Sequence, residues 1–150
     1  MADHIRKQLR DKLQEILLGL DTTDQHAFIN RPRAYPLAET ELPGLVIKLH
    51  DESAEPQTLK RPGRRIERVL NAVIDCYAKG DEAEDKLDQM QLEIELAMVE
   101  DVTLDGLAKD SYFAQADDDD DAEGDQPCWM RSLTFRIICH TADNAPDVAI

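Results

Sequence analysis

The stretch CWMRSLTFRIICHT, residues 128–141, carries the clearest structural signal in this sequence. Its residues alternate between two sets, one mostly large and apolar and one mostly polar. The first set is Trp129, Leu133, Phe135, Ile137 and Cys139, and the second is Met130, Ser132, Thr134 and Arg136. Alternation with a period of two is typical of a β-strand with one buried face. The stretch therefore predicts a strand over residues 129–139 and a fold built around a sheet.

Other segments also have strand-like sequences. Residues 45–50 alternate in the same way and predict a second strand with one buried face. Residues 27–31 predict a short edge strand within a loop that is rich in proline and polar residues, and residues 107–114 predict a further strand. The polar stretch 51–65 contains two prolines, which disfavour a central strand, so it predicts a long connection.

Two segments have apolar residues at helical spacing. Residues 5–20 predict an amphipathic helix, with Asp3 as its N-cap and Gly19 near its end. Residues 81–99 predict a second helix, because acidic residues at its start match the helix dipole and one apolar stripe runs along it. The members of that stripe are Leu87, Met90, Ile94, Ala97 and Met98.

Residues 66–77, IERVLNAVIDCY, fit both a helix and a strand. Their apolar residues form a helical stripe, but their β-branched and aromatic content suits a strand equally well, so the residues leave both alternatives open. The order of elements predicts an α+β fold, in which two helices pack on one face of a small mixed, mostly antiparallel sheet. We expect a single domain over residues 1–143 and a flexible C-terminal tail over residues 144–150.

The composition argues against several classes of function. The 150 residues include 32 acidic and 17 basic ones, a net charge of −15. Nonspecific nucleic-acid binding and attachment to anionic membranes need the opposite balance. No apolar run is long enough to predict a membrane span, and the charged N-terminus does not resemble a signal or transit peptide. Cys76, Cys128 and Cys139 include no CxxC pair. We expect a soluble, intracellular protein with reduced thiols.

The acidic charge is concentrated in one segment. Residues 81–126 contain 18 acidic residues and two lysines, whereas the rest of the chain has 14 acidic and 15 basic residues. Five basic residues crowd into nine positions: Lys60, Arg61, Arg64, Arg65 and Arg68. Such separation suits contacts between oppositely charged surfaces, so we predict that these five form a protein interface. The alternative is that they are simply solvated.

The run ADDDDDAEGDQP, residues 116–127, predicts a flexible acidic loop. Its five consecutive aspartates are candidate ligands for weak association of a hard cation: Asp117, Asp118, Asp119, Asp120 and Asp121. The nearest calcium-loop register begins at Asp119. It fails, because its twelfth position, which should be a bidentate Glu, is Met130.

Motifs for catalysis are missing from the sequence. The histidines His4, His26, His50 and His140 have no partner at a metal-ligand spacing. Cys139 and His140 are adjacent on the predicted strand, so their side chains point to opposite faces and cannot act as a dyad. No glycine-rich phosphate loop or GxSxG motif is present. We expect no enzymatic activity and no cofactor.

The order of motifs resembles that of a known family. In residues 4–49, HIRKQLRDKLQEILLGLDTTDQHAFINRPRAYPLAETELPGLVIKL, an amphipathic helix enters a DT turn, and a short apolar element with an RP follows. An acidic, proline-containing lead then enters an alternating strand. Later come a strand, an acidic helix, a DDD-containing loop with Trp129 and the closing strand SLTFRIICHT. Over most of residues 4–141 the chain resembles tail terminator proteins of long, non-contractile phage tails, the lambda U-protein type.

The resemblance implies both structure and role. It implies that residues 66–77 form a strand. Proteins of this family are similar to tail-tube subunits in fold and form a hexameric ring on the last ring of the tube. The ring stops polymerisation and presents the surface that meets the head-completion proteins. The resemblance thus implies a virion protein at the head-proximal end of the tail, assembled in the host cytoplasm, with DNA passing through the ring unbound.

A second function is kept open beside this one. The acidic segment would also suit an adaptor or inhibitor that sequesters a basic partner or mimics nucleic acid. Nucleic-acid mimics spread carboxylates along a rigid face, whereas here the sequence places them in a helix start and a loop. Deleting residues 117–125 should abolish the function of a mimic but leave the assembly of a ring-forming terminator intact.

Overall fold

The computed structural model describes residues 3–31, 37–58, 63–121 and 128–150. The described elements form an α+β fold with two helices and a six-stranded, mostly antiparallel mixed sheet, as the sequence predicts. In chain order they are α1 (Ile5–Leu17), β1 (Ala27–Phe28), a 3-10 turn (Glu39–Glu41), β2 (Gly44–Pro56), β3 (Arg65–Lys79), α2 (Ala83–Glu100), β4 (Asp110–Asp121), β5 (Cys128–Ala142) and β6 (Ala145–Ala149).

The sheet is built around β3 and β5. Its strand order is β1-β2-β3-β5-β4, and β6 pairs with the end of β5. β3 and β5 pair antiparallel over their whole length, from Arg65 opposite Ala142 to Lys79 opposite Cys128. Among the strands that the structure describes, only β1 and β2 run parallel, over two residues of each strand. The alternating stretch 128–141 therefore lies in a central strand, β5.

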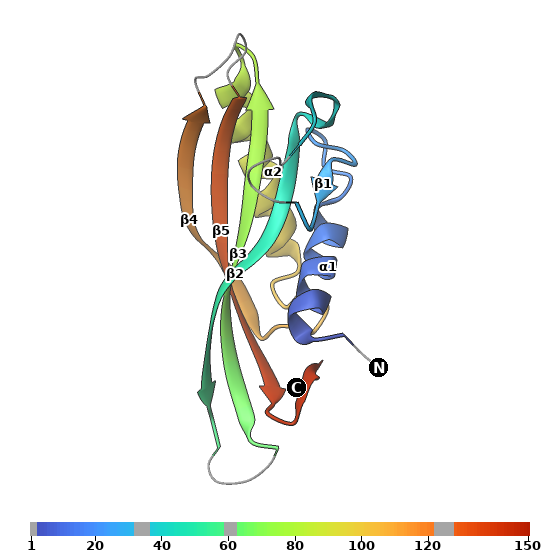
Figure 1. Cartoon of the computed structure of the whole chain (residues 1–150), viewed down its shortest axis with the longest axis vertical. Helices are drawn as coiled ribbons and strands as arrows, with labels where there is room; N and C mark the ends of the chain where they lie inside the picture. The colour runs from blue at the N-terminus through green and yellow to red at the C-terminus, as the bar shows by residue number, and fades with distance from the viewer. Residues whose placement is uncertain (1–2, 32–36, 59–62, 122–127) are drawn as a thin grey trace.

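Both helices cover the same face of the sheet, and the hydrophobic core lies between them and the sheet (Figure 1). α1 contributes Ile5, Leu9, Leu13 and Leu17, and α2 contributes Leu87, Met90, Ile94 and Met98. These residues pack against the inward side chains of β2, β3 and β5. Each large apolar side chain that is fully buried contributes about 1.5–3 kcal/mol to folding, so this layer is the main source of stability.

α1 begins at Ile5, as the sequence predicts, but its N-cap differs from the prediction. The prediction of Asp3 as N-cap is wrong, because His4 is the N-cap and its ring Nδ1 accepts a hydrogen bond from the backbone N–H of Arg6. Asp3 instead forms an ion pair with Lys7. The helix ends at Leu17, and Gly19 follows with a φ of +83°, a conformation that glycine adopts without strain.

The ambiguous segment 66–77 lies within strand β3, as the resemblance implies. Its backbone pairs with β2 on one side and β5 on the other, so a central position in the sheet decides between the two alternatives. Leu70, Ile74 and Cys76 face the helices and are fully buried. Because neighbouring residues point the other way, the opposite face of the sheet receives Val69, Asn71 and Val73.

The segment 51–65 is not the long connection that the sequence predicts. β2 continues to Pro56 and β3 begins at Arg65, and the two strands pair from Glu52 opposite Leu70 to Pro56 opposite Ile66, after a register shift between Leu49 and Glu52. Polar side chains suit this part of β2 because both of its faces are exposed. This part of β2, the start of β3 and the end of β5 form an arm that projects past the helices (Figure 1).

Two other predictions are wrong at the C-terminal side of the chain. The acidic loop predicted for residues 116–127 is a strand up to Asp121, because β4 pairs with β5 throughout and ends opposite Cys128. Residues 122–127 lie outside the described residues. The predicted tail 144–150 contains β6, which pairs with β5, and the side chain of Gln8 in α1 donates a hydrogen bond to the backbone oxygen of Asp147 at 2.7 Å.

Neither described helix combines the length and the apolar character that crossing a membrane requires.

Candidate interaction surfaces

The predicted basic interface lies on the projecting arm. Lys60 and Arg61 are outside the described residues, Arg64 directly precedes β3, and Arg65 and Arg68 lie at the start of β3. Strand alternation separates the last two: Arg68 shares the face of the buried Cys139, whereas Arg65 and its neighbour His140 lie on the opposite face. The three described arginines therefore do not form one patch on one face.

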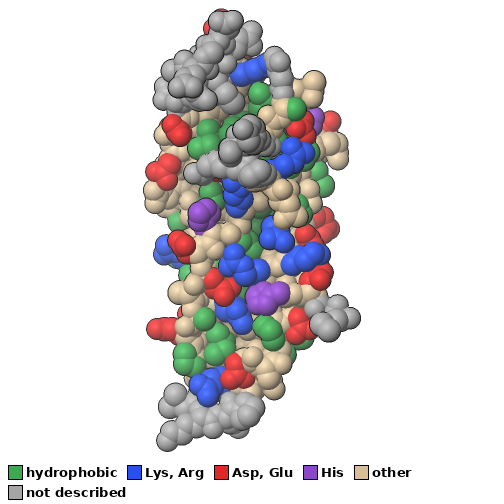
Figure 2. Space-filling model, viewed as in Figure 1, with side chains coloured by type: hydrophobic (Ala, Val, Ile, Leu, Met, Phe, Trp, Pro, Cys, Tyr) green, Lys and Arg blue, Asp and Glu red, His purple; other side chains and the backbone are tan. Residues whose placement is uncertain are grey.

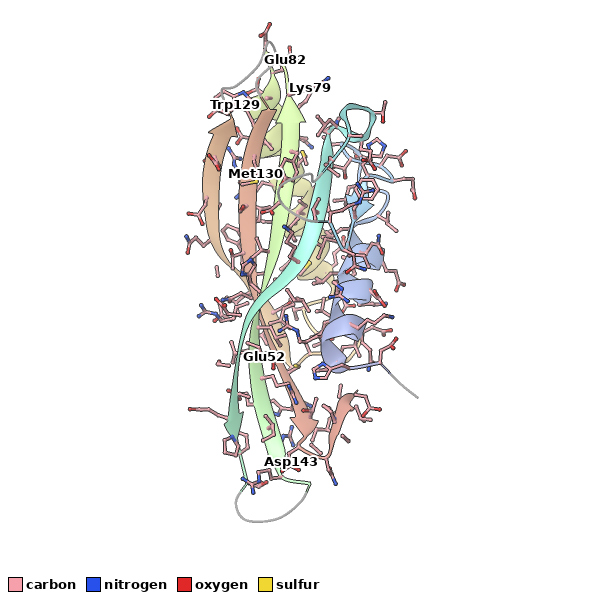
Figure 3. The ribbon with its side chains drawn as sticks, viewed as in Figure 1. Glu52, Lys79, Glu82, Trp129, Met130 and Asp143 are labelled. Atoms are coloured by element: carbon pink, nitrogen blue, oxygen red, sulfur yellow. The ribbon has the colours of Figure 1, made fainter. Side chains whose placement is uncertain are left out.

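Each of these arginines has a partner within the chain. Arg64 Nε lies 3.2 Å from Asp143 Oδ2, and Arg68 Nη1 donates to Glu52 Oε2 at 3.1 Å. Arg65 Nε donates to His140 Nδ1 at 2.7 Å. Figure 3 shows Asp143 near the lower end of the arm and Glu52 close to the point where the sheet twists. These contacts hold the arm together, and they leave the predicted role of the arginines as an interface untested.

The five aspartates of the predicted cation site are divided by strand geometry. In β4, Asp117 and Asp119 pair with Ser132 and Met130 on the face away from the helices, whereas Asp118 pairs with Arg131 on the helix face. The side chains of Asp120 and Asp121 lie outside the described part. Among the residues that the structure describes, no group of three or more metal-ligating side chains comes together.

Asp118 belongs to a charged cluster that sequence analysis missed. Arg131 Nε donates to Asp118 Oδ1 at 2.6 Å, and its Nη1 donates to Asp88 Oδ1 at 2.6 Å and to Gln91 Oε1 at 3.1 Å. Burial by itself lowers the pKa of Arg131, but the hydrogen bonds that it donates to the two carboxylates outweigh burial and raise that pKa overall. The cluster fastens β4 and β5 to α2 and offsets part of the acidic charge.

The charges are separated along the molecule. The acidic β4 pairs with residues 128–138 of β5, whereas Arg64, Arg65 and Arg68 lie beside the other end of β5. On the face that Figure 2 shows, lysine and arginine side chains follow the middle of the molecule and carboxylates lie mostly toward its margins. The acidic segment of the sequence is thus a side-by-side helix and strand, α2 and β4, rather than a helix and a loop.

The face of the sheet away from the helices contains a wide hollow of about 780 Å³. Its lining includes His50, Asn71, Tyr112, Thr134 and Arg136, so hydrogen-bonding groups dominate it. Next to it, the fully buried carboxylate of Asp75 accepts a hydrogen bond from Ser132 Oγ at 2.6 Å and lies 3.9 Å from Lys48 Nζ. These contacts give the buried carboxylate a hydrogen-bond donor and a nearby positive charge, and they therefore stabilise the fold.

Cysteine and histidine side chains are placed as the strand pattern predicts. Cys139 is fully buried in the core, and burial raises the pKa of its thiol to about 11. Burial also raises the pKa of the Cys76 thiol. His140 lies on the opposite face from Cys139, where it contacts Arg65 and Glu67. A nucleophilic Cys–His pair is therefore absent at this position.

No family model matches the chain, and no curated protein matches it at significant similarity.

Proposed function

We propose that this chain is a tail terminator of the long-tailed phage type, a structural protein that forms a hexameric ring on the tail tube. In this role the ring stops polymerisation of the tube and offers the surface for head joining. The described elements follow the order that the resemblance implies: helix, short apolar element, two strands, acidic helix and closing strand; the aspartates that the resemblance places in a loop are instead in strand β4. This order supports the proposal but is not specific to it.

The observation that carries the proposal is a sheet with two open edges. β1 pairs only with Leu45 and Val46, so within the described residues β2 has no outer strand from Ile47 to Pro56, and Arg6 donates side-chain hydrogen bonds to the backbone oxygens of Leu49 and His50 on this edge. At the other edge, β4 pairs with β5 alone among the described strands. Open edges expose backbone N–H and C=O groups that another strand can use. Contacts between two different edges of neighbouring copies are heterologous, the type that closes rings.

The charge on β4 favours this type of contact over a twofold dimer. If two copies paired through β4, the aspartates of one strand would lie near those of the other, and like charges on paired strands are destabilising. The edge formed by Ile47–Pro56 carries fewer consecutive charges. Because that edge holds three acidic residues and one lysine, pairing β4 with it in the next copy reduces the repulsion, so a head-to-tail ring is the expected assembly.

Imaging and charge reversal test the proposal. Negative-stain images of concentrated protein should show closed rings at low and at moderate salt. Replacing Arg64→Glu together with Arg65→Glu should leave a folded monomer, because this change removes charge from the arm without touching the core. Lys7→Glu with Lys86→Glu carries the same charge change on the helices and should still form rings. If the arginine variant still formed rings at moderate salt, Arg64 and Arg65 would not be needed for the contact between copies.

The adaptor function remains the second candidate, because α2 and β4 place carboxylates on adjacent elements. Deleting residues 117–125 would remove part of β4 that pairs with β5, so a milder change separates the two functions better. Asp117→Asn with Asp119→Asn neutralises two exposed side chains on one face. A terminator with these changes should still form rings. An adaptor should lose most of its affinity for a basic probe such as polylysine.

A further inference from the structure

α2 has a second apolar stripe, on the side that faces away from the core. Leu92, Leu96 and Val99 are 52%, 56% and 67% exposed. Their spacing of four and three residues places them on one line along the helix, opposite the buried Met90, Ile94 and Met98. Single exposed leucines are ordinary on protein surfaces, but three in one line form a continuous apolar surface.

The stripe continues into a groove beside it. Val99 also lines a groove of about 120 Å³ between α2 and β4, together with Met98, Val102 and Phe135 from the protein interior. The rim of the groove on the strand side is formed by Phe113, which is 38% exposed and pairs with the buried Phe135 on the helix face of the sheet. We call the stripe and the groove together the α2 surface. An exposed aromatic side chain next to an aliphatic ridge is typical of surfaces that bind a partner.

Carboxylates flank the α2 surface on both sides. Within α2 the exposed or partly exposed acidic residues are Glu84, Asp85, Asp88, Glu93, Glu95 and Glu100, and Lys86 is the only basic residue of the helix. Two copies of the chain that met through this surface would bring these carboxylates together, so charge opposes self-association here. A partner with positive charge beside its apolar side chains would be attracted.

Most of the described lysine and arginine side chains of this chain already form ion pairs, so few could contact the α2 surface of a second copy. Arg6 and Arg68 pair with Glu52, Arg31 with Glu41, Arg64 with Asp143, and Arg131 with Asp88 and Asp118. Lys7 and Lys12 also contact carboxylates within the chain. Most described basic side chains are thus already paired. This favours a different protein over a second copy as the occupant of the α2 surface.

We infer that the α2 surface binds a basic amphipathic helix of another protein. Apolar side chains of that helix, at a spacing of three and four residues, would pack along Leu92, Leu96 and Val99, with one side chain entering the groove beside Phe113. Its lysines and arginines would lie beside Asp88, Glu95 and Glu100. This inference does not depend on ring formation and goes beyond the proposed function.

A model peptide tests the inference on the intact protein. The probe is a fluorescent, roughly 18-residue helical peptide of leucine and lysine with apolar residues at helical spacing, and the comparison peptide has the same composition in a non-amphipathic order. Fluorescence anisotropy at moderate salt should show binding of the amphipathic peptide at least about tenfold tighter than binding of the comparison peptide. Equal affinity of the two peptides would mean charge attraction alone and would overturn the inference, as would no binding.

Variants locate the site. Leu92→Ser with Leu96→Ser removes apolar side chains that are already half exposed, so the fold should persist, which circular dichroism checks. This variant should weaken binding of the amphipathic peptide about tenfold. Val148→Ser alters an apolar residue of similar exposure, 48%, on β6 and should bind as the original protein does. Unchanged affinity of the leucine variant would overturn the assignment to α2. Ring formation, measured separately on the same variants, tests the proposed function.

Discussion

Replacing Arg131→Met should loosen the attachment of β4 to α2. The Arg131 side chain is only 9% exposed, whereas the side chains of its partners Asp118 and Asp88 are 67% and 65% exposed. A hydrogen bond to a charged group is worth about 1.5–3 kcal/mol. Solvent around the carboxylates reduces this toward the value of a surface ion pair, about 0.2–1 kcal/mol. Methionine keeps the apolar volume, so we expect the free energy of unfolding to fall by about 2 kcal/mol.

A double-mutant cycle isolates the contact that matters most. Asp118→Asn removes one charge of the cluster, and the coupling between Arg131→Met and Asp118→Asn should be about 1 kcal/mol. The assay is urea unfolding followed by circular dichroism at neutral pH, with all variants measured at one salt concentration. Arg136→Met is the matched control, because this arginine is exposed on the opposite face of the same strand, and its effect should stay within about 0.5 kcal/mol.

A coupling energy close to zero would refute this reasoning. It would mean that Arg131 and Asp118 contribute independently and that β4 is held by backbone pairing alone. An effect of Arg136→Met as large as that of Arg131→Met would also contradict the account, because it would trace the loss to β5 in general rather than to the cluster.

Three further outcomes follow from the structure. Leu9→Ala in α1 should reduce the free energy of unfolding by about 2–5 kcal/mol, because Leu9 is fully buried; urea unfolding measures this. Burial lowers the reactivity of the Cys76 and Cys139 thiols through their raised pKa, so iodoacetamide at mildly alkaline pH should label them only after denaturation, as mass spectrometry of the peptides would show. Glu93→Gln should destabilise the protein at neutral pH but not in acid.

The direction of the Glu93 effect follows from its hydrogen bonds. Burial alone would raise the pKa of Glu93, but the hydroxyl and backbone N–H of Thr22 donate to its carboxylate and lower that pKa overall. A carboxylate with a lowered pKa in the folded state stabilises the fold above its unfolded pKa of about 4.3. That contribution is lost as the pH falls through the lower, folded pKa. Thermal unfolding of both proteins between neutral and acidic pH should therefore show the difference shrink.

The strongest periodic patterns predicted the fold correctly. The alternation in residues 129–139 and the helical stripe in 81–99 each report a single buried face, so they identify β5 and α2 without knowledge of the neighbours. The segment 66–77 has no single pattern of this sort, because its residues fit a helix and a strand equally well. Because β3 lies between two other strands, only long-range pairing decides its structure, and the residues alone could not.

The errors at residues 51–56 and 116–121 have one physical cause. Polar and acidic residues usually indicate solvated loops, but an edge strand needs no apolar face where both of its sides meet water. β2 and β4 contain such stretches, held by backbone pairing with β3 and β5 and, at Asp118, by Arg131. The outer stripe of α2 was also missed. Its signal is present in the sequence, as Leu92, Leu96 and Val99 at helical spacing outside the core stripe.

The particle mass in solution is the most direct test of whether the chain forms a hexameric ring. Mass photometry and sedimentation velocity should be run over a range of protein concentrations, at low and at moderate salt. A closed hexameric ring would have a mass of about 102 kDa, six times the 17.0 kDa of the chain. If the chain is a ring-forming terminator, a discrete species at this mass should appear, and its fraction should increase with protein concentration. A 17.0 kDa monomer at every concentration and salt would contradict the proposal.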